Sequence, residues 1–462
     1  MPNKAQILKQ AINKEPVLLN KLKEIYSSED LIEKKRLQLI ALIDSEYFQD
    51  QENLTLARCP GRISLSKHAD YINSDLLYLL DDRDVFVAGQ ITEAGECSEL
   101  RLINSNHNFI DLCFEYSELD KYLEDKTAWY FYPLKIMQKL GIKLNNKSLT
   151  LNITSDLPTG SGLSSSHALM ISSYLALQNL FKLKRKTDKE LIFFYQEVES
   201  ERGFKSGLGD QSAQLLSKKN QFSFIKLFPE LKVEYREIPE NFAIVTAPSF
   251  IKADKSLPEF AAANKNIEKY KNINKLVKNL GVEYLADLLY VKTEAEIFIF
   301  LETITDIDLK QLALYGLAEA ARVKYLKEES LSLDSIGKHL NLSHQAEQVS
   351  MTILETCPKL IENELGELRP LALTLQTGYY GASTVENDAI KYLATSYEGV
   401  YGASISGAGL GGNDIIVCHK DFATSVKEKL IQDYYLPRGL EEKARERVHI
   451  SSFTAKANLI LE

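Results

Sequence analysis

A glycine- and serine-rich loop directly before a long apolar segment restricts the fold of this sequence more than any other feature. The loop reads LPTGSGLSSSHALM over residues 157–170, and the apolar stretch HALMISSYLALQNLFKL continues from it. That stretch is too long and too rich in Leu, Ala and Met for a strand, so we expect a buried helix that begins at the loop. The β-rich run SLTLNITS comes before the loop. The sequence therefore predicts a strand, a tight loop and a buried helix, in that order.

Such a loop is suited to holding an anion. Gly160 and Gly162 permit close approach of the backbone, and the serines supply hydroxyl groups. Backbone N–H groups at a helix N-terminus, assisted by the helix dipole, attract phosphate. The alternative is an ordinary helix with a serine N-cap after a glycine turn, because serine is a preferred N-cap residue. The loop lacks the Gly-Lys-Ser/Thr ending of a Walker loop, so the phosphate site that it predicts is of another type.

Composition excludes several classes of partner. The 462 residues carry a net charge of -9, which argues against a nucleic-acid partner. Charges interrupt the N-terminal segment too often for a signal peptide, and no segment reaches roughly 18 uninterrupted apolar residues. The five cysteines are scattered without CxxC spacing, so neither a disulfide framework nor a zinc site is indicated. We expect a cytoplasmic protein that binds neither membranes nor nucleic acid.

The pattern of elements along the chain predicts an α+β protein with two lobes. Residues 1–50 show helical spacing and form a predicted N-terminal helical extension. A stretch from about 258 to 366 and a segment at about 421–433 also have helical patterns. We place two further domains at 51–240 and 241–462, packed without a flexible linker. The β-rich runs are LTLAR, GRISL, VFVAGQI, SLTLNITS, FSFIKL, KVEYREI, FAIVTAP and a last one near ANLILE.

Three segments together resemble the motifs of the GHMP kinases, the family named for galactokinase, homoserine, mevalonate and phosphomevalonate kinases. The loop is similar to the second motif of the family. SISGAGLGGND, residues 404–414, looks like the third, a glycine-rich turn over the nucleotide, although alone it could mark a tight hairpin. RCPGRISLSKHADY, residues 58–71, resembles the first motif of galactokinases. Its His-x-Asp-Tyr element belongs to the sugar 1-kinases, which disfavours the mevalonate and homoserine branches.

The resemblance implies a fold and an activity. The fold is the two-lobed GHMP kinase fold, with the nucleotide-binding domain at 51–240, the C-terminal domain at 241–462 and the active site in the cleft between lobes. The activity is ATP-dependent transfer of the γ-phosphoryl group to the anomeric (C1) hydroxyl of a monosaccharide. Mg²⁺ is the implied cofactor, and the protein is expected to be a monomer or a small homo-oligomer. A catalytically silent sugar sensor is the alternative, which loss of the base or of the loop would favour; neither is seen.

The motif matches also imply catalytic and nucleotide-binding residues. GFKSGLGDQSAQLL, residues 203–216, is similar to the Gly-x-x-Asp-Gln segment of galactokinases and implies Asp210 as the base, since an aspartate is ionised at neutral pH and can accept a proton. Arg62 matches the arginine that positions the acceptor hydroxyl and stabilises developing negative charge. The implied ATP-binding residues are Gly160, Ser161, Gly162, Leu163, Ser164, Ser165, Ser166, Gly407 and Gly409.

The magnesium ligands implied by the resemblance are Ser166 and an acid upstream of the base. In QEVESERG the register implies Glu199. The spacing to the base is one residue shorter than in typical galactokinases, so Glu197 and Glu201 remain open. His167 stands where the family usually has a small alanine, and we assign it no role.

The acceptor-binding segment departs from the galactokinase pattern at one position. His68, Asp70 and Tyr71 keep the pattern, and Gly207 is implied beside them, but Lys67 stands where galactokinases have a glutamate, and one residue is missing. A lysine has three donors and no acceptor, so it suits a carboxylate. This substitution suggests a uronic acid, such as galacturonate, as the acceptor. The alternative is that Lys67 points away because the deletion rearranges the loop.

Overall fold

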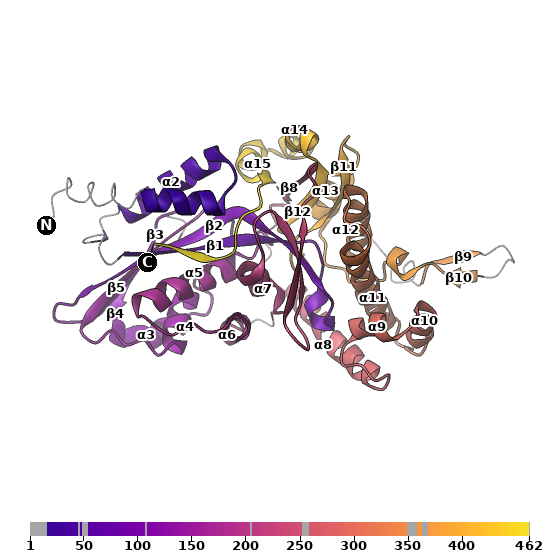
Figure 1. Ribbon diagram of the computed structural model, residues 1–462, viewed down its shortest axis with the longest axis horizontal. Helices are drawn as coiled ribbons and strands as arrows, with labels where there is room; N and C mark the ends of the chain where they lie inside the picture. The colour runs from indigo at the N-terminus through magenta and orange to yellow at the C-terminus, as the bar shows by residue number, and fades with distance from the viewer. Residues whose placement is uncertain are drawn as a thin grey trace.

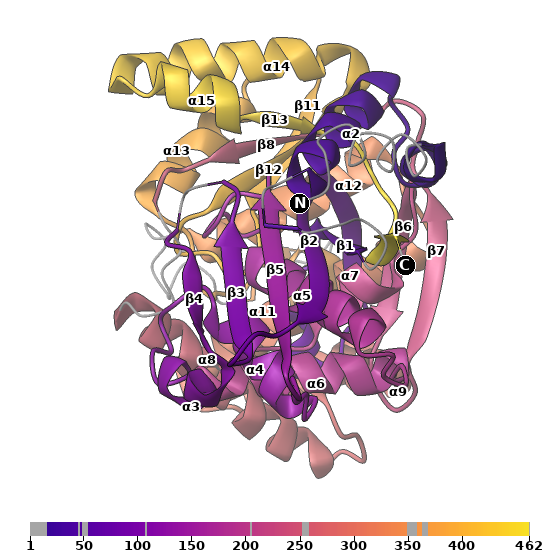
Figure 2. The ribbon, with the colours of Figure 1, turned by 90° about the vertical axis from the view of Figure 1, so that its left-hand side faces the viewer.

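The computed structural model describes residues 16–44, 47–48, 54–106, 109–203, 206–251, 258–348, 358–362 and 368–461, and the side chains of all of these except 258–264. Within these ranges the strands form an eight-stranded sheet, a four-stranded sheet and a short two-stranded sheet. Figures 1 and 2 show the two larger sheets with helices packed around them.

The eight-stranded sheet holds the N-terminal strands and the last strand of the chain. Its order is β14-β1-β2-β5-β3-β4, with β6 paired to β2 and β7 to β6, and only β3 and β5 run parallel. Figure 2 shows β3, β5 and β2 side by side. The strands are β1 (Leu54–Ser64), β2 (Leu76–Glu93), β3 (Glu99–Asn104), β4 (Leu112–Glu115), β5 (Lys147–Ser155), β6 (Gln221–Lys226), β7 (Lys232–Glu237) and β14 (Asn458–Leu461).

Both faces of this sheet are covered, so part of its central strand β2 is apolar on both sides. Along β2, Val85 and Val87 point into a core shared with α5, whereas Phe86 and Ala88 point into a second core shared with α2. Figure 1 shows α2 and α5 on opposite sides of β1 and β2. The helices of this half are α2 (Glu29–Ile43), α3 (Leu119–Tyr122), α4 (Phe131–Lys139), α5 (Ser165–Leu180), α6 (Asp188–Glu201) and α7 (Gly209–Leu216).

The four-stranded sheet has the order β11-β12-β8-β13 and separates two layers of helices. Val245 and Ile416 face a core with α13, α14 and α15, and Ile244 and Ile415 face the large core on the opposite side, where α12 packs on β11. The elements are β8 (Phe242–Pro248), β11 (Val400–Ile405), β12 (Asn413–His419), β13 (His449–Ser451), α13 (Val385–Ala394), α14 (Ala423–Leu430) and α15 (Glu441–Arg447).

A helical layer lies beside these sheets and forms a fourth core (Figure 1). It includes Ile72 from the acceptor-binding segment and Ile405 from the end of β11, so the helices meet both polar motifs. The elements of this layer, with the adjoining two-stranded sheet, are α8 (Pro258–Lys278), α9 (Leu288–Val291), α10 (Glu294–Glu302), α11 (Ile307–Glu328), α12 (Leu333–Glu347), β9 (Leu360–Glu362) and β10 (Leu368–Pro370).

The N-terminal extension docks on the sheet through a buried ionic network as well as through apolar packing. Residues 16–25 are helical and pack with α2 against β1 and β2. Lys35 of α2 is fully buried, and its Nζ lies 2.6 Å from Asp84 Oδ2 and 2.9 Å from Asp156 Oδ2. Arg58 Nη2 lies 2.6 Å from Asp84 Oδ1, and Tyr26 donates a hydrogen bond to Asp84. The extension therefore supplies a counter-charge to the sheet.

Most elements predicted from the sequence are present. The runs at 85–91, 148–155, 222–227, 232–238 and 242–248 are strands, and the apolar stretch after the loop is α5. The two runs LTLAR and GRISL form one strand, β1, with a register shift between Pro60 and Arg62.

The prediction that helices continue to about residue 366 was wrong at β9, which is a strand. β9 and β10 form an exposed hairpin, so no buried face imposes an alternating pattern of apolar and polar residues on the sequence. Residues 1–15 of the predicted extension lie outside the described residues. The domain boundaries at 50/51 and 240/241 stay predictions, and β14 returns to the first sheet.

Candidate active site

The bend in β1 brings Arg62 to the centre of the predicted site. Arg62 is almost fully buried, and its Nε and Nη2 each lie 2.7 Å from Oδ1 of Asp210 at the start of α7. Its Nη1 donates to the carbonyl oxygen of Gly162 at 2.5 Å. One guanidinium group thus joins the predicted base to the predicted phosphate loop. Charge-assisted bonds of this kind hold a carboxylate in a fixed orientation.

The glycine-serine loop turns sharply so that α5 begins with its N-terminus at the site. Gly160, Gly162 and Ser164 have φ angles of 65°, 71° and 66°, in the left-handed region. Ser164 does not cap α5 with its side chain; its Oγ donates instead to Asp210 Oδ2 at 2.9 Å. The loop therefore holds the second oxygen of the same carboxylate.

The glycine-rich turn after β11 packs backbone to backbone on this loop. A Cβ at Gly162 would lie 2.5 Å from the carbonyl oxygen of Ser406, so only glycine fits there. Ser406 Oγ donates to Gly162 O at 2.8 Å, and the Asn413 backbone and side-chain amides donate to Ser161 O at 2.9 and 2.8 Å. Two motifs that lie about 240 residues apart in the sequence form one substructure.

These segments line a cleft of about 800 Å³. Most of the residues predicted for the site contribute to its wall. Those that do are Arg62, His68, Asp70, Tyr71, Gly160, Ser161, Gly162, Ser164, Ser165, Ser166, Glu199, Gly207, Asp210, Gly407 and Gly409. The two that do not are Lys67 and Leu163. Leu163 is fully buried in the core under the loop, where its carbonyl oxygen accepts from the Arg62 backbone N–H at 3.0 Å.

Among the three candidate acids on α6, only Glu199 faces the cleft. It is fully buried, and its Oε2 lies 3.3 Å from Nε2 of His167. Glu197 and Glu201 instead form ion pairs with Lys139, at 3.2 and 2.8 Å, on the outer face of the helix.

His167, to which the sequence assigned no role, lies between Glu199 and Asp210. Its Nδ1 is 3.7 Å from Asp210 Oδ2, and the ring is buried at the third position of α5. The only signal in the sequence was a polar ring at the start of an apolar helix.

The acceptor side of the cleft is built around Asp70. Its Oδ2 accepts from the backbone N–H groups of Leu208 and Gly209 at 2.8 and 3.1 Å, at the start of the helix that carries Asp210. Burial raises the pKa of Asp70, which these two amides oppose. Gly207 contributes by its lack of a side chain, since a Cβ there would lie 1.7 Å from Asp70 Oδ2.

His68 lies against an aromatic ring that the sequence analysis did not identify. Its ring stacks on Tyr380 with 3.6 Å between centroids, and its Nε2 lies 3.5 Å from Glu347 Oε1. Tyr380 lines the cleft, and burial raises its pKa well above the ordinary value. The GYYG segment that contains Tyr380 carries no local pattern that marks it as part of a site.

Lys67 does not reach the cleft, and this position contradicts its prediction as a substrate-binding residue. The side chain is 1% exposed. Its ammonium group donates to the carbonyl oxygens of Ser64, at 3.0 Å, and Ile405. Burial lowers its pKa to about 8, although Glu319 and Glu347 raise it. The shortened loop has turned the lysine into the protein, where it joins β1 to the end of β11.

Two aromatic residues, Phe109 and Trp129, also line the cleft. Phe109 and Trp129 have ring centroids 6.3 Å apart, and Trp129 Nε1 donates to Ile110 O at 3.2 Å. Arg202 holds this wall by donating to the carbonyl oxygens of Lys126 and Thr127 at 2.6 and 2.8 Å. The segment TAWYFYPLKIM contains Trp129, but its sequence gave no reason to place the ring in the site.

Comparison with known proteins agrees with this arrangement. The family model for the GHMP kinases N terminal domain matches residues 131–218, which include the loop, Glu199 and Asp210. Galactokinase of Thermotoga maritima is 25% identical over 389 residues, which cover 83% of this chain and 95% of that protein. Galactokinase of Clostridium beijerinckii is 26% identical over 400 residues, with 83% and 90% covered. The chain is thus similar to the GHMP kinases in this domain and to galactokinases over most of its length.

Solved structures give the same fold. The crystal structure of Lactococcus lactis galactokinase complexed with galactose matches with a TM-score of 0.71 at 20% identity, covering 92% of this chain and 99% of that one. Methanococcus jannaschii mevalonate kinase matches with a TM-score of 0.51 at 16% identity, covering 87% and 98%. The predicted GHMP kinase fold is confirmed. Within the part of the chain that the structure describes, no helix is long and apolar enough to cross a bilayer.

Proposed function

We propose that this protein transfers the γ-phosphoryl group of ATP to the anomeric hydroxyl of a neutral hexose, with galactose as the first candidate. One observation carries the proposal: the Asp210 carboxylate lies between the phosphate loop and the acceptor-binding segment, with one oxygen held by Arg62 and the other by Ser164. Such a carboxylate is placed to accept a proton from a hydroxyl that attacks a phosphoryl group. A cytoplasmic location and a monomeric or small homo-oligomeric state stay predictions.

In this proposal Asp210 takes the proton of the acceptor hydroxyl, and Arg62 orients the carboxylate and offsets the negative charge that develops. Because Arg62 also donates to Gly162 O, the base keeps a fixed position relative to the phosphate loop. Positioning of this kind supplies most of the catalysis in phosphoryl transfer, where there is little covalent chemistry for the protein to do.

The nucleotide would lie along the glycine-serine loop. Backbone N–H groups from Gly162 to Ser166 and the N-terminus of α5 would bind its phosphates, and the glycine-rich turn at Gly407 and Gly409 would close over them. The aromatic side chains of Phe109 and Trp129 form the apolar wall that a purine base requires.

Ser166 and Glu199 are the residues that would hold Mg²⁺. The donor set fits, because a hydroxyl and a carboxylate are hard oxygen ligands and Mg²⁺ uses few protein ligands alongside phosphate oxygens and water. Glu199 is buried at the cleft wall beside His167, so its carboxylate lies in the same cleft as the phosphate loop and Ser166. The ion would supply neutralisation of the phosphate charge.

The acceptor would be bound by His68, Asp70 and Tyr71. Asp70 Oδ2 is engaged by backbone amides, so the carboxylate is oriented before the sugar arrives. No lysine from this segment faces the acceptor, since the Lys67 ammonium group is bonded to backbone carbonyls. Lys67 therefore gives no support for a uronic acid as the acceptor, and we propose a neutral sugar.

The test is ADP release by the purified protein with ATP, Mg²⁺ and a panel of galactose, glucose, other hexoses, pentoses and galacturonate. We expect galactose or a close epimer to be the best substrate and its product to carry phosphate on C1, as read from phosphorus coupling to the anomeric proton. Strong preference for galacturonate would contradict the neutral-sugar assignment. Phosphate on another carbon would contradict the anomeric assignment.

The matched variant is Asp210→Asn, which keeps the shape of the side chain and removes the proton acceptor. We expect kcat to fall by about 10²- to 10⁴-fold while binding of ATP and sugar remains. A variant that turns over at a near-normal rate would refute the assignment of the base. Sugar binding by the wild-type protein without ADP release would instead favour a catalytically silent sugar sensor.

A further inference from the structure

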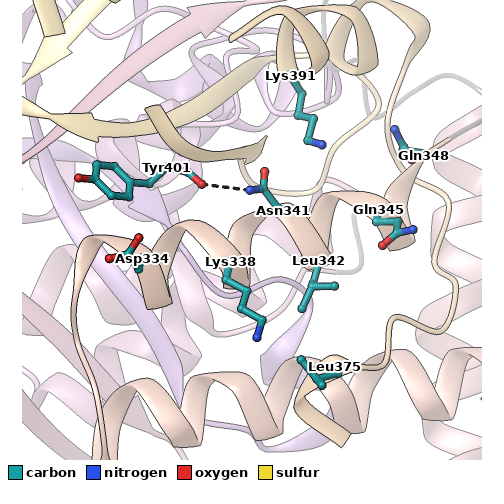
Figure 3. A pocket seen from close by; sticks show the side chains of 9 residues that line it. All are labelled: Asp334, Lys338, Asn341, Leu342, Gln345, Gln348, Leu375, Lys391 and Tyr401. Atoms are coloured by element: carbon teal, nitrogen blue, oxygen red, sulfur yellow. Dashed lines mark hydrogen bonds between the residues drawn. The ribbon is translucent and has the colours of Figure 1, made fainter. Parts of the chain in front are cut away.

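A second cavity lies apart from the active-site cleft. It has a volume of about 490 Å³ and shares no lining residue with the cleft. Figure 3 shows its wall, which α12 provides on one side and α13 and β11 on the other. The volume is within the range of small-molecule sites.

The cavity is lined by more positively charged than negatively charged side chains. Lys338 and Lys391 line it with one carboxylate, that of Asp334. Within the described ranges neither ammonium group has an ion pair or a hydrogen bond. The nearby helix α11 differs, because its Lys324 and Lys327 both pair with glutamates.

Lys391 is the more informative of the two lysines, because it is half-buried. Burial lowers its pKa, and the carboxylate of Asp388, which raises it, does not compensate. Asp388 is already engaged, since its Oδ1 lies 3.1 Å from His344 Nε2 and accepts from Ser383 Oγ at 2.6 Å. Figure 3 shows Lys391 reaching from α13 into the space. A partly desolvated ammonium group that forms no ion pair within the described ranges favours an anion.

Hydrogen-bond donors in the cavity wall also favour an anionic ligand. Gln345 Oε1 accepts from the Lys359 ammonium at 3.3 Å, which turns the amide so that its NH₂ group is available. Burial lowers the pKa of Lys359 as well, and Arg322 lowers it further. A third cationic group therefore lies behind the wall.

We propose that this cavity is a second ligand site of the protein, selective for the phosphate ester of a small metabolite. A phosphate ester carries up to two negative charges on compact oxygens, which suits a cavity lined by the Lys391 ammonium group on α13, the exposed Lys338 on α12 and amide donors. The rest of the volume, beside Leu342 and Leu375, accommodates the organic part of the ligand.

The site connects to the active-site cleft through α12. Lys338, Asn341 and Gln345 face the cavity, whereas His339 and Glu347 of the same helix face the other way, with His339 Nε2 2.7 Å from Leu65 O and Glu347 near His68.

The strand β11 provides a second connection. Asn341 Nδ2 donates to Tyr401 O at 3.1 Å, and its Oδ1 accepts from the Ala403 backbone at 3.3 Å. This strand continues into the glycine-rich turn that packs on the phosphate loop. A bound phosphate ester would therefore change the KM for the acceptor; this coupling, unlike the binding itself, rests on the proposed function.

Binding is tested by calorimetric titration of the full chain with inorganic phosphate and, separately, with glucose 6-phosphate, in the presence of a saturating non-hydrolysable ATP analogue and galactose. The test variant is K338Q/K391Q. The control is K427Q/K443Q, which removes the same charge from α14 and α15. We expect the ester to bind more tightly than phosphate, the test variant to lose at least tenfold in affinity, and the control to match the wild type.

Equal affinity of the test variant and the wild type, or no binding of either probe at millimolar concentration, would overturn the proposal. Loss of all binding when the cleft is filled would also overturn it, by assigning the ligand to the cleft. The variant K391R, which keeps the charge, must retain affinity, and far-ultraviolet circular dichroism checks the fold of each variant. If the protein proves inactive towards every sugar, the comparison of test variant and control still decides this site, so the two failures are distinguishable.

Discussion

Replacing Lys67 by methionine separates the two interpretations of this residue. The sequence suggested a contact with a carboxylate on the acceptor, and the structure places the ammonium group between the carbonyl oxygens of Ser64 and Ile405. Burial lowers the pKa of Lys67 from the ordinary 10.5 to about 8. Lys67→Met keeps the length of the side chain and removes the charge, so its effect on stability should depend on pH.

The sign and size of this dependence follow from proton linkage. Below pH 8 both the folded and the unfolded chain hold the proton on Lys67, and the cost of burying the charge is fully present. Between pH 8 and 10.5 the folded state releases the proton first, so the free energy of unfolding rises with pH. The full shift corresponds to roughly 3 kcal/mol, of which about 2 kcal/mol appears between pH 7 and 9.5. The two carbonyls that lose their donor cost about 1–3 kcal/mol each at every pH.

The assay is urea unfolding of the wild type and Lys67→Met at pH 7 and 9.5. The difference in unfolding free energy between the two proteins should grow by about 2 kcal/mol at the higher pH, because the other titrating groups cancel in the comparison. Lys443→Met, at an exposed position of α15, is the control and should show no such growth. A difference that is constant with pH would refute the buried ammonium, and selective loss of activity on galacturonate would restore the substrate contact.

Two further substitutions test other parts of the structure. Lys35→Ala should lower the free energy of unfolding by about 3–5 kcal/mol, because it removes the ammonium group that pairs with Asp156 and leaves the buried Asp84 with Arg58. Lys34→Ala, at the exposed neighbouring position, should change the free energy of unfolding little. Thermal unfolding measures both, and equal midpoints would contradict the role of the N-terminal extension. Gly207→Ala should raise the KM for the sugar and lower kcat, each by at least about tenfold, because the new methyl group displaces the Asp70 carboxylate. Steady-state kinetics compare this variant with Gly95→Ala, where nothing lies within 4 Å of the added carbon. Equal effects of the two substitutions would argue for a general loss of stability.

Local patterns were sufficient for most of the fold. β8 is a nearly continuous apolar run because helices cover both sides of its sheet, and α5 is apolar on nearly every side because it lies inside the core. The sequence did not show which strands pair. It showed two runs along β1 but not the register shift between them, which lies beside the Arg62 that contacts Asp210.

The order of the motifs along the chain predicted which residues lie in the site, but it did not predict the directions of their side chains. Fifteen of the predicted positions line one cleft, because the motifs that carry them are brought together by the fold that they resemble. Lys67 was misassigned since the neighbouring His68 takes a left-handed backbone conformation, with φ 50°, and redirects the chain after a deletion. Such a turn at a non-glycine residue is not predictable from residue types alone.

The two buried lysines show why charge on its own is a weak guide to position. In the sequence, Lys35 belongs to a run of alternating charged and apolar residues that reads as a solvated helix, yet it is fully buried against Asp84 and Asp156. The Lys67 ammonium group is equally buried but forms no ion pair among the described residues, so burial lowers its pKa, whereas the carboxylates beside Lys35 raise the pKa of that lysine despite its burial. The two ammonium groups differ in their partners, which come from strands and loops distant in sequence. A lysine buried with its counter-ions is expected to stabilise a docked segment at every pH near neutrality, and one buried among carbonyls is expected to weaken the fold until it loses its proton.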